Sequence, residues 1–113
     1  MLYKTESEMN CKMKTIVTLA SVSSFEAFLA KCPKICVVVH ADWCPHCQRY
    51  IPLLDDAEPP VHLYLIEEEV YKKLTTDLLA VKGYPTTFIL EKGAVLKKQA
   101  GELTVRQLME MCD

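Results

Sequence analysis

Glycine and tryptophan are scarce in this sequence of 113 residues, which contains three glycines and a single tryptophan. It also lacks an apolar run long enough to cross a membrane, and a cluster of lysine and arginine of the kind that binds nucleic acid. Its 13 basic and 15 acidic residues nearly balance. We therefore expect one domain that has neither a membrane nor a nucleic acid as its partner.

Cysteine, by contrast, is plentiful, and six cysteines in a short chain could form a framework of disulfides. Half of the residues are hydrophobic, however, which is enough for the core that such scaffolds lack. Cys36 lies in an apolar run, where a free cysteine acts as a small hydrophobic residue. Free thiols are best tolerated in a reducing compartment, so we predict a cytoplasmic protein. Residues 13–20 resemble a signal peptide only weakly, which makes a secreted or periplasmic location the less favoured alternative.

Strands and helices are predicted to alternate along most of the chain. Residues 1–13 are polar and are expected to form an N-terminal extension to a domain at 14–113. The apolar patterns predict strands over 16–19, 35–40, 61–66, 86–90 and 95–100, helices that begin near residues 23, 44 and 104, and a helix over 68–80. This order is typical of an α/β fold in which a mixed sheet of about five strands is flanked by about four helices.

Short polar motifs predict where two of the helices begin. Ser23 and Glu26 have the spacing of a capping box, in which each side chain bonds to the backbone of the other residue. Thr104 and Gln107 have the same spacing ahead of the last predicted helix. Pro52 lies inside the predicted helix that follows residue 44, and we expect it to kink that helix.

The segment Trp43-Cys44-Pro45-His46-Cys47 follows the apolar run 35–40, at a predicted junction between a strand and a helix. A helix N-terminus carries unpaired N–H groups and a partial positive charge, which favour a thiolate over a thiol. Two cysteines one helical turn apart can also form a reducible disulfide. We therefore predict that Cys44 is the nucleophile and the more exposed thiol, and that Cys47 is the resolving thiol.

The same cysteine spacing occurs in zinc sites, so a metal site is the alternative to redox chemistry. A structural zinc ion needs four ligands, and the other cysteines show no spacing that would complete the set with Cys44 and Cys47. We therefore expect neither a metal nor a cofactor.

Residues 15–112 resemble the thioredoxin family. Features shared with the family are Trp43 before the first cysteine, Pro52 five residues after the second, the cis-proline loop Tyr84-Pro85-Thr86, and glycines at Gly83, Gly93 and Gly101. The resemblance implies a thioredoxin fold and a thiol–disulfide oxidoreductase. It further implies protein thiols and disulfides as substrates, and a reductase or oxidase that recycles the cysteine pair.

Pro45 and His46 distinguish this chain from thioredoxins, which usually carry Gly-Pro between the cysteines. The pair resembles that of the bacterial periplasmic thiol oxidases of the Dsb type. An imidazole at His46 is expected to donate to the Cys44 sulfur and to lower its pKa, which makes the disulfide a stronger oxidant. The alternative is an exposed loop histidine without an electronic effect.

A substrate groove is expected around Cys44. The resemblance implies a cis peptide bond before Pro85, which leaves the backbone of Tyr84 free to pair with an extended substrate. An exposed tryptophan beside the nucleophile also suggests binding. The residues predicted to bind substrate are Trp43, Gly83, Tyr84, Pro85, Ala100 and Gly101.

One position departs from the family. Thioredoxins bury an acid that helps to move the proton of the resolving cysteine, and the matching residue here is Val38. Water, His40 or Asp42 could replace it. The sequence therefore predicts a thiol–disulfide oxidoreductase that is more oxidising than ordinary thioredoxin. The alternative is a protein-binding module of the same fold that senses redox state without turnover.

Overall fold

A five-stranded mixed sheet forms the centre of the protein. The computed structural model describes residues 14–112 except 32, 57–60 and 75–78. Within this part the strands are β1 (Lys14–Val17), β2 (Ile35–His40), β3 (His62–Glu67), β4 (Thr86–Glu91) and β5 (Ala94–Ala100). They lie in the order β1-β3-β2-β4-β5. β3 is parallel to both β1 and β2, whereas β4 is antiparallel to both β2 and β5.

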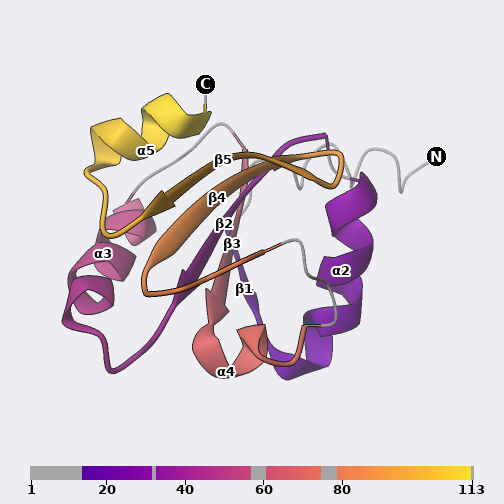
Figure 1. The fold of residues 1–113 in the computed structure, drawn as a ribbon, viewed down its shortest axis with the longest axis horizontal. Coiled ribbons are helices and arrows are strands. Elements are labelled where there is room, and N and C mark those ends of the chain that lie inside the picture. Colours follow the sequence, from indigo (N-terminus) through magenta and orange to yellow (C-terminus); the bar gives the residue numbers. More distant parts are fainter. Residues whose placement is uncertain (1–13, 32, 57–60, 75–78, 113) are drawn as a thin grey trace.

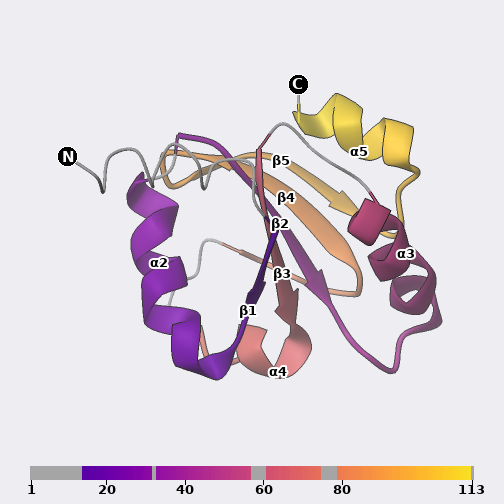
Figure 2. The same cartoon turned by 180° about the vertical axis from the view of Figure 1, so that it is seen from behind.

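Helices cover both faces of this sheet. The helices of the described part are α2 (Val22–Lys31), α3 (Pro45–Asp56), α4 (Glu68–Tyr71) and α5 (Val105–Cys112), and a short 3₁₀ helix η1 (Leu19–Ser21) precedes α2. Figure 1 and Figure 2 show α3 and α5 on one side of the sheet and α2 on the other, with α4 at the end of β3. The predicted α/β fold with a mixed sheet is confirmed.

The central strand β2 is buried on both faces, which explains why its sequence is a continuous apolar run. Alternate side chains of a strand point to opposite faces. Ile35, Val37 and Val39 pack in one hydrophobic cluster with residues of α2, and Cys36 and Val38 pack in another with residues of α3 and α5. The sheet thus lies between two apolar layers. β2 lies between these layers and ends at His40.

The first helical region begins earlier than the sequence predicts. β1 ends at Val17, and the predicted cap Ser23 lies inside α2. The box is formed instead by Thr18 and Ser21, because the N–H of Thr18 donates to Oγ of Ser21 over 2.8 Å. The prediction for Ser23 was therefore wrong. Thr18 and Ser21, which have the same spacing and lie five residues earlier, form the capping box at the start of η1.

The predicted helix over 68–80 is also wrong, because α4 ends at Tyr71. The Tyr71 hydroxyl donates to the carbonyl of Leu79 over 2.7 Å and accepts from the N–H of Val81 over 3.2 Å. A side chain thus bonds backbone groups of the segment that leads to β4, and Leu79 is buried without being helical. Residues 75–78, in the middle of the predicted helix, lie outside the described residues.

The start of α5 agrees with its predicted capping box. The N–H of Gln107 donates to Oγ1 of Thr104 over 3.1 Å, and the N–H of Thr104 donates to Oε1 of Gln107 over 2.9 Å. Pro52 lies inside α3, as expected. No helix in the described part of the chain combines the length and apolarity that a membrane span needs. The predicted N-terminal extension, 1–13, lies outside the described residues.

Candidate active site

Cys44 and Cys47 lie where β2 passes into α3. β2 ends at His40 and α3 begins at Pro45, so Cys44 immediately precedes the helix and Cys47 lies in its first turn. Proline suits the first helical position, because its missing N–H would have no partner there in any case. The N–H of Cys44 donates to the carbonyl of Ala41 over 3.1 Å, which fixes the turn between strand and helix.

Both thiols are free and buried, with Cys44 5 % and Cys47 1 % exposed. Burial raises the pKa of the Cys44 thiol, but its polar neighbours lower it by more. These neighbours are the N–H and thiol of Cys47, the N–H of His46 and the positive charge of Arg49. The pKa of Cys44 is therefore below its ordinary value, as expected for a sulfur at a helix N-terminus.

The pKa of Cys47 is shifted in the opposite direction. Burial raises its pKa to about 11, although the N–H of Ala41 donates to its sulfur over 3.4 Å and lowers the pKa in part. The neighbouring Cys44 and the carboxylate of Asp42 raise it further. The pair thus consists of one thiol with a lowered pKa and one with a raised pKa, an arrangement that suits a nucleophile and a resolving group.

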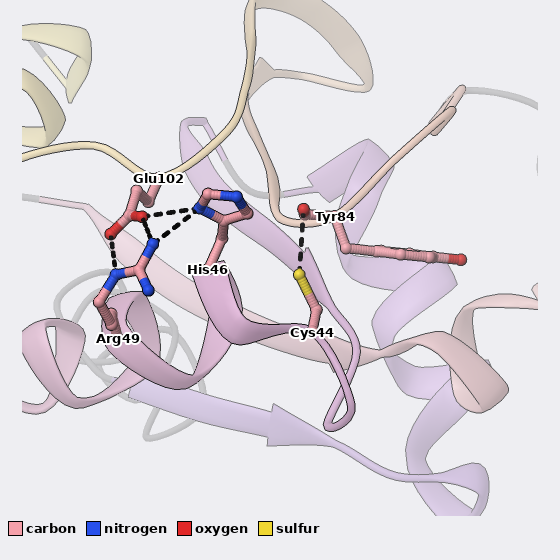
Figure 3. Close-up of polar contacts among 5 residues, drawn as sticks. All are labelled: Cys44, His46, Arg49, Tyr84 and Glu102. Atoms are coloured by element: carbon pink, nitrogen blue, oxygen red, sulfur yellow. Dashed lines mark hydrogen bonds and ion pairs between the residues drawn. The ribbon is translucent and has the colours of Figure 1, made fainter.

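The loop before β4 lies directly against Cys44. Its Tyr84–Pro85 bond is cis, as the resemblance implied. The Cys44 thiol donates to the carbonyl of Tyr84 over 3.4 Å (Figure 3), and the N–H of Gly101 donates to the carbonyl of Pro85 over 2.8 Å. Three segments distant in sequence therefore meet at one place: the start of α3, the loop before β4 and the end of β5.

The residues predicted to bind substrate are distributed around this meeting point. Trp43 is 64 % exposed, its ring lies edge-on to that of Tyr84 with 6.0 Å between centroids, and its Nε1 donates to Glu68. Ala100 is paired with Thr86 at the start of β4. Gly101 has a φ of 92°, which favours glycine. The structure thus brings together Trp43, Tyr84, Pro85, Ala100 and Gly101.

Gly83 differs from the other predicted residues, because its geometry gives no reason for a glycine. A Cβ added there would meet no atom within 4 Å, and its φ is not one that favours glycine. Its carbonyl accepts from the hydroxyl of Thr86 over 2.8 Å, which ties it to the start of β4.

The ring of His46 does not bond to the Cys44 sulfur as predicted; within the described residues its hydrogen bonds go elsewhere. Its Nδ1 lies 2.8 Å from Oε1 of Glu102 and 2.9 Å from a guanidinium nitrogen of Arg49. Arg49 also donates to both carboxylate oxygens of Glu102, so the three side chains form a closed network at the start of α3 (Figure 3). The N–H of His46, by contrast, lowers the pKa of Cys44.

Sequence reasoning missed Arg49, Glu102 and Glu68. Arg49 lies three residues after His46, a spacing that places two side chains side by side on a helix, so its proximity could have been inferred. Glu102 follows Gly101, which was already assigned to the groove. No sequence signal pointed to Glu68, because its contact with Trp43 depends on where α4 begins.

A cavity of about 260 Å³ lies behind Cys47 and is lined by His40, Ala41, Asp42, Cys47, Gln48, Ile51 and Pro52. Val38, at the position of the family's acid, is fully buried among apolar residues. Burial lowers the pKa of His40, although Asp42 and Glu67 oppose this effect, so the imidazole is mostly neutral at pH 7. His40 and Asp42 are therefore the titratable groups that share this cavity with Cys47.

A metal site has no further support in this part of the chain. Among the described residues, no three side chains of His, Cys, Asp or Glu gather closely enough to hold a metal ion. The Cys44 thiol faces the carbonyl of Tyr84, and the Cys47 sulfur accepts from the N–H of Ala41.

Known proteins resemble this chain in both sequence and fold. Among curated proteins, the protein disulfide isomerase-like 5-2 of Oryza sativa subsp. japonica is 32 % identical over 96 residues, covering 76 % of this chain and 22 % of that protein. The protein disulfide-isomerase of Datisca glomerata is 31 % identical over 107 residues, covering 87 % of this chain and 20 % of that protein. The chain thus spans about a fifth of the length of these relatives.

Solved structures share the fold at low sequence identity. A mutant thioredoxin from Halobacterium salinarum has a TM-score of 0.69 at 15 % identity, covering 89 % of this chain and 88 % of that one. The zinc-bound form of human ERp44 has a TM-score of 0.66 at 16 % identity, covering 87 % of this chain and 30 % of that one. The family model described as Thioredoxin matches residues 16–113. The chain therefore belongs to the thioredoxin family.

Proposed function

We propose that this chain is a thiol–disulfide oxidoreductase that acts on protein thiols and disulfides through Cys44 and Cys47. The observation that carries the proposal is the opposite shift of the two thiols, with a lowered pKa at Cys44 and a pKa of about 11 at Cys47. The family supports the same activity, and the relatives are named protein disulfide-isomerases.

In the first step, the Cys44 thiolate attacks one sulfur of a substrate disulfide. A bond forms between Sγ of Cys44 and that sulfur, the substrate S–S bond breaks, and the other substrate sulfur leaves as a thiolate that takes up a proton. The carbonyl of Tyr84, 3.4 Å from Cys44, marks where the substrate backbone can pair beside the sulfur.

In the second step, Cys47 loses its proton and its sulfur attacks Sγ of Cys44. The mixed disulfide breaks, the Cys44–Cys47 disulfide forms, and the second substrate sulfur leaves as a thiolate and is protonated. Two electrons have then passed from the cysteine pair to the substrate, and the reverse sequence oxidises a substrate dithiol. Because the pKa of Cys47 is about 11, this step needs a base. His40 and Asp42 line the cavity beside Cys47 and are the candidates, with solvent water as the alternative.

The pair is further proposed to be more oxidising than that of an ordinary thioredoxin. A group that stabilises the Cys44 thiolate stabilises the reduced form, so the disulfide becomes a stronger oxidant. Arg49 and the N–H of His46 act on Cys44 in this sense. The redox equilibrium with glutathione tests this directly, and a reducing potential equal to that of thioredoxin would contradict it.

The activity itself is tested by replacing Cys44. The Cys44→Ser variant should lose insulin reduction and dithiol oxidation, because serine cannot form the mixed disulfide. Cys36→Ala is the matched control, since Cys36 is also buried but lies in the apolar cluster between the sheet and α3 and α5. Equal rates for Cys44→Ser and the wild-type protein would refute the assignment.

A redox-sensitive binding module is the second candidate, favoured by the contrast between a nearly buried Cys44 and an exposed Trp43 beside it. A wild-type protein that retains partner binding in one redox state, but turns over no disulfide, would support this alternative. A cytoplasmic location and a recycling reductase or oxidase stay predictions, to be tested by fractionation of the source cells and by trapping partners on Cys47→Ser.

A further inference from the structure

We propose that Glu102 is a positioning residue that fixes His46 and Arg49 at the start of α3, beside Cys44, and offsets the positive charge of Arg49, so that Glu102 limits how oxidising the cysteine pair can be. This inference rests on the proposed redox function and adds to it a residue outside the Cys-Pro-His-Cys segment. It is carried by the contacts of the carboxylate in Figure 3.

The Glu102 carboxylate bonds to both basic side chains of the first turns of α3. Its Oε1 lies 2.8 Å from Nδ1 of His46 and accepts from the guanidinium of Arg49, whose Nε donates to Oε2 over 3.4 Å. Arg49 in turn lies 2.9 Å from Nδ1 of His46. A protonated ring can donate from Nδ1 to Glu102, whereas a neutral ring can accept there from Arg49, and Glu102 holds the guanidinium in both cases.

The backbone places Glu102 at this point. Gly101 adopts a φ of 92°, and its N–H donates to the carbonyl of Pro85, in the loop that faces Cys44. The residue after Gly101 is thereby directed from the end of β5 toward the start of α3. Its side chain is 30 % exposed, compared with 61 % for His46 and 58 % for Arg49. The carboxylate is thus the most enclosed member of the network.

Glu102 influences Cys44 by opposing the charge of Arg49. The positive charge of Arg49 lowers the pKa of Cys44, and the bonds from Arg49 and His46 lower the pKa of Glu102. Glu102 is therefore ionised at neutral pH, where its negative charge opposes the field that Arg49 exerts on the sulfur. Removing that charge should leave the Arg49 cation uncompensated, which would stabilise the thiolate and the reduced form.

The test is the Glu102→Gln variant, which retains the size of the side chain and removes its charge. We expect the Cys44 thiolate, followed by its absorbance near 240 nm, to form at lower pH than in the wild-type protein. The equilibrium constant for oxidising glutathione should rise by about two- to fivefold, as expected for exposed charges, and the increase should shrink at high salt. Glu91→Gln is the matched control, because Glu91 is exposed at the opposite end of β4 from the site.

Two further variants separate positioning from a general loss of structure. Glu102→Asp keeps the charge, so its glutathione equilibrium should lie nearer to that of the wild-type protein than Glu102→Gln does. In an Arg49→Gln background, Glu102→Gln should have a smaller effect. A thiolate titration that is unchanged or shifted to higher pH in Glu102→Gln, or an equal effect with and without Arg49, would overturn the inference. The titration needs no turnover, so this result is independent of whether the enzymatic assignment holds.

Discussion

The Cys44 thiol donates to the carbonyl of Tyr84 over 3.4 Å, although 40 residues separate the two in sequence. The proposed nucleophile and the backbone that would align a substrate therefore already lie together in the free protein. A substrate strand that pairs beside Tyr84 would bring its sulfur next to Cys44 without a large rearrangement of the chain. Such an arrangement lowers the entropic cost of bringing the reacting atoms together.

The two active-site thiols should differ greatly in alkylation. A lowered pKa gives Cys44 more thiolate at a given pH, whereas a pKa of about 11 leaves roughly one Cys47 in ten thousand ionised at pH 7. Iodoacetamide at pH 7 should therefore modify Cys44 first. Peptide mapping by mass spectrometry measures this order, with the Cys44→Ser variant as the control for background labelling. Equal labelling of Cys44 and Cys47 at pH 7 would contradict the separation.

Replacing His40 should slow the resolving step in a way that depends on pH. His40→Phe removes the neutral imidazole from the cavity behind Cys47, so breakdown of the mixed disulfide should slow by roughly tenfold or more at pH 7. The defect should fade as the pH approaches the pKa of Cys47, about 11, because hydroxide then removes the proton. Stopped-flow measurement on a preformed mixed disulfide gives the rate.

Asp42→Asn is the comparison for His40→Phe, since Asp42 lines the same cavity. A defect in Asp42→Asn alone would show that the Asp42 carboxylate accepts the proton of Cys47. Wild-type rates in both variants would leave water as the acceptor and would contradict the prediction for His40.

Tyr50→Phe should lower the free energy of unfolding by about 1–2 kcal/mol, measured by urea denaturation. The Tyr50 hydroxyl and Oγ1 of Thr87 lie 2.9 Å apart in the buried region between α3 and β4, so the variant leaves one hydroxyl without its partner. The Thr87→Val variant and the double variant complete a cycle. If the two single effects simply add, the hydrogen bond does not contribute as proposed.

Leu108→Ala should lower the free energy of unfolding by about 2–5 kcal/mol, because Leu108 is 1 % exposed between α5 and the sheet. The matched control is Val105→Ala on the same helix, where the side chain is 40 % exposed. We expect its effect to remain below about 1 kcal/mol. Thermal denaturation followed by circular dichroism compares the two, and similar losses would mean that α5 is not anchored through Leu108.

The succession of strands along the chain and the placement of the cysteines at a junction between a strand and a helix could be predicted because local signals and burial agree. The apolar run 35–40 is typical of a central strand, and the spacing of Thr104 and Gln107 is typical of the start of a helix. The helix over 68–80 failed because the Tyr71 hydroxyl bonds backbone groups eight and ten residues later, a contact that periodicity does not reveal.

The site was predictable for residues near the cysteines but less so for their partners. Trp43 and Tyr84 could be placed together through the family resemblance. The interaction of His46 with Glu102 could not, because it joins side chains 56 residues apart. Long exposed side chains have many rotamers, so their pairing is determined by the tertiary structure and not by local sequence.

The central strand β2 contributes neighbouring side chains to both apolar layers and ends next to the cysteine pair. Losing either layer would remove the support from one face of this strand. We therefore expect unfolding to be cooperative, with no intermediate in which one layer melts and the redox site survives. A thiol-trapping agent that detects Cys47 and a circular dichroism signal that detects the helices should then report the same midpoint.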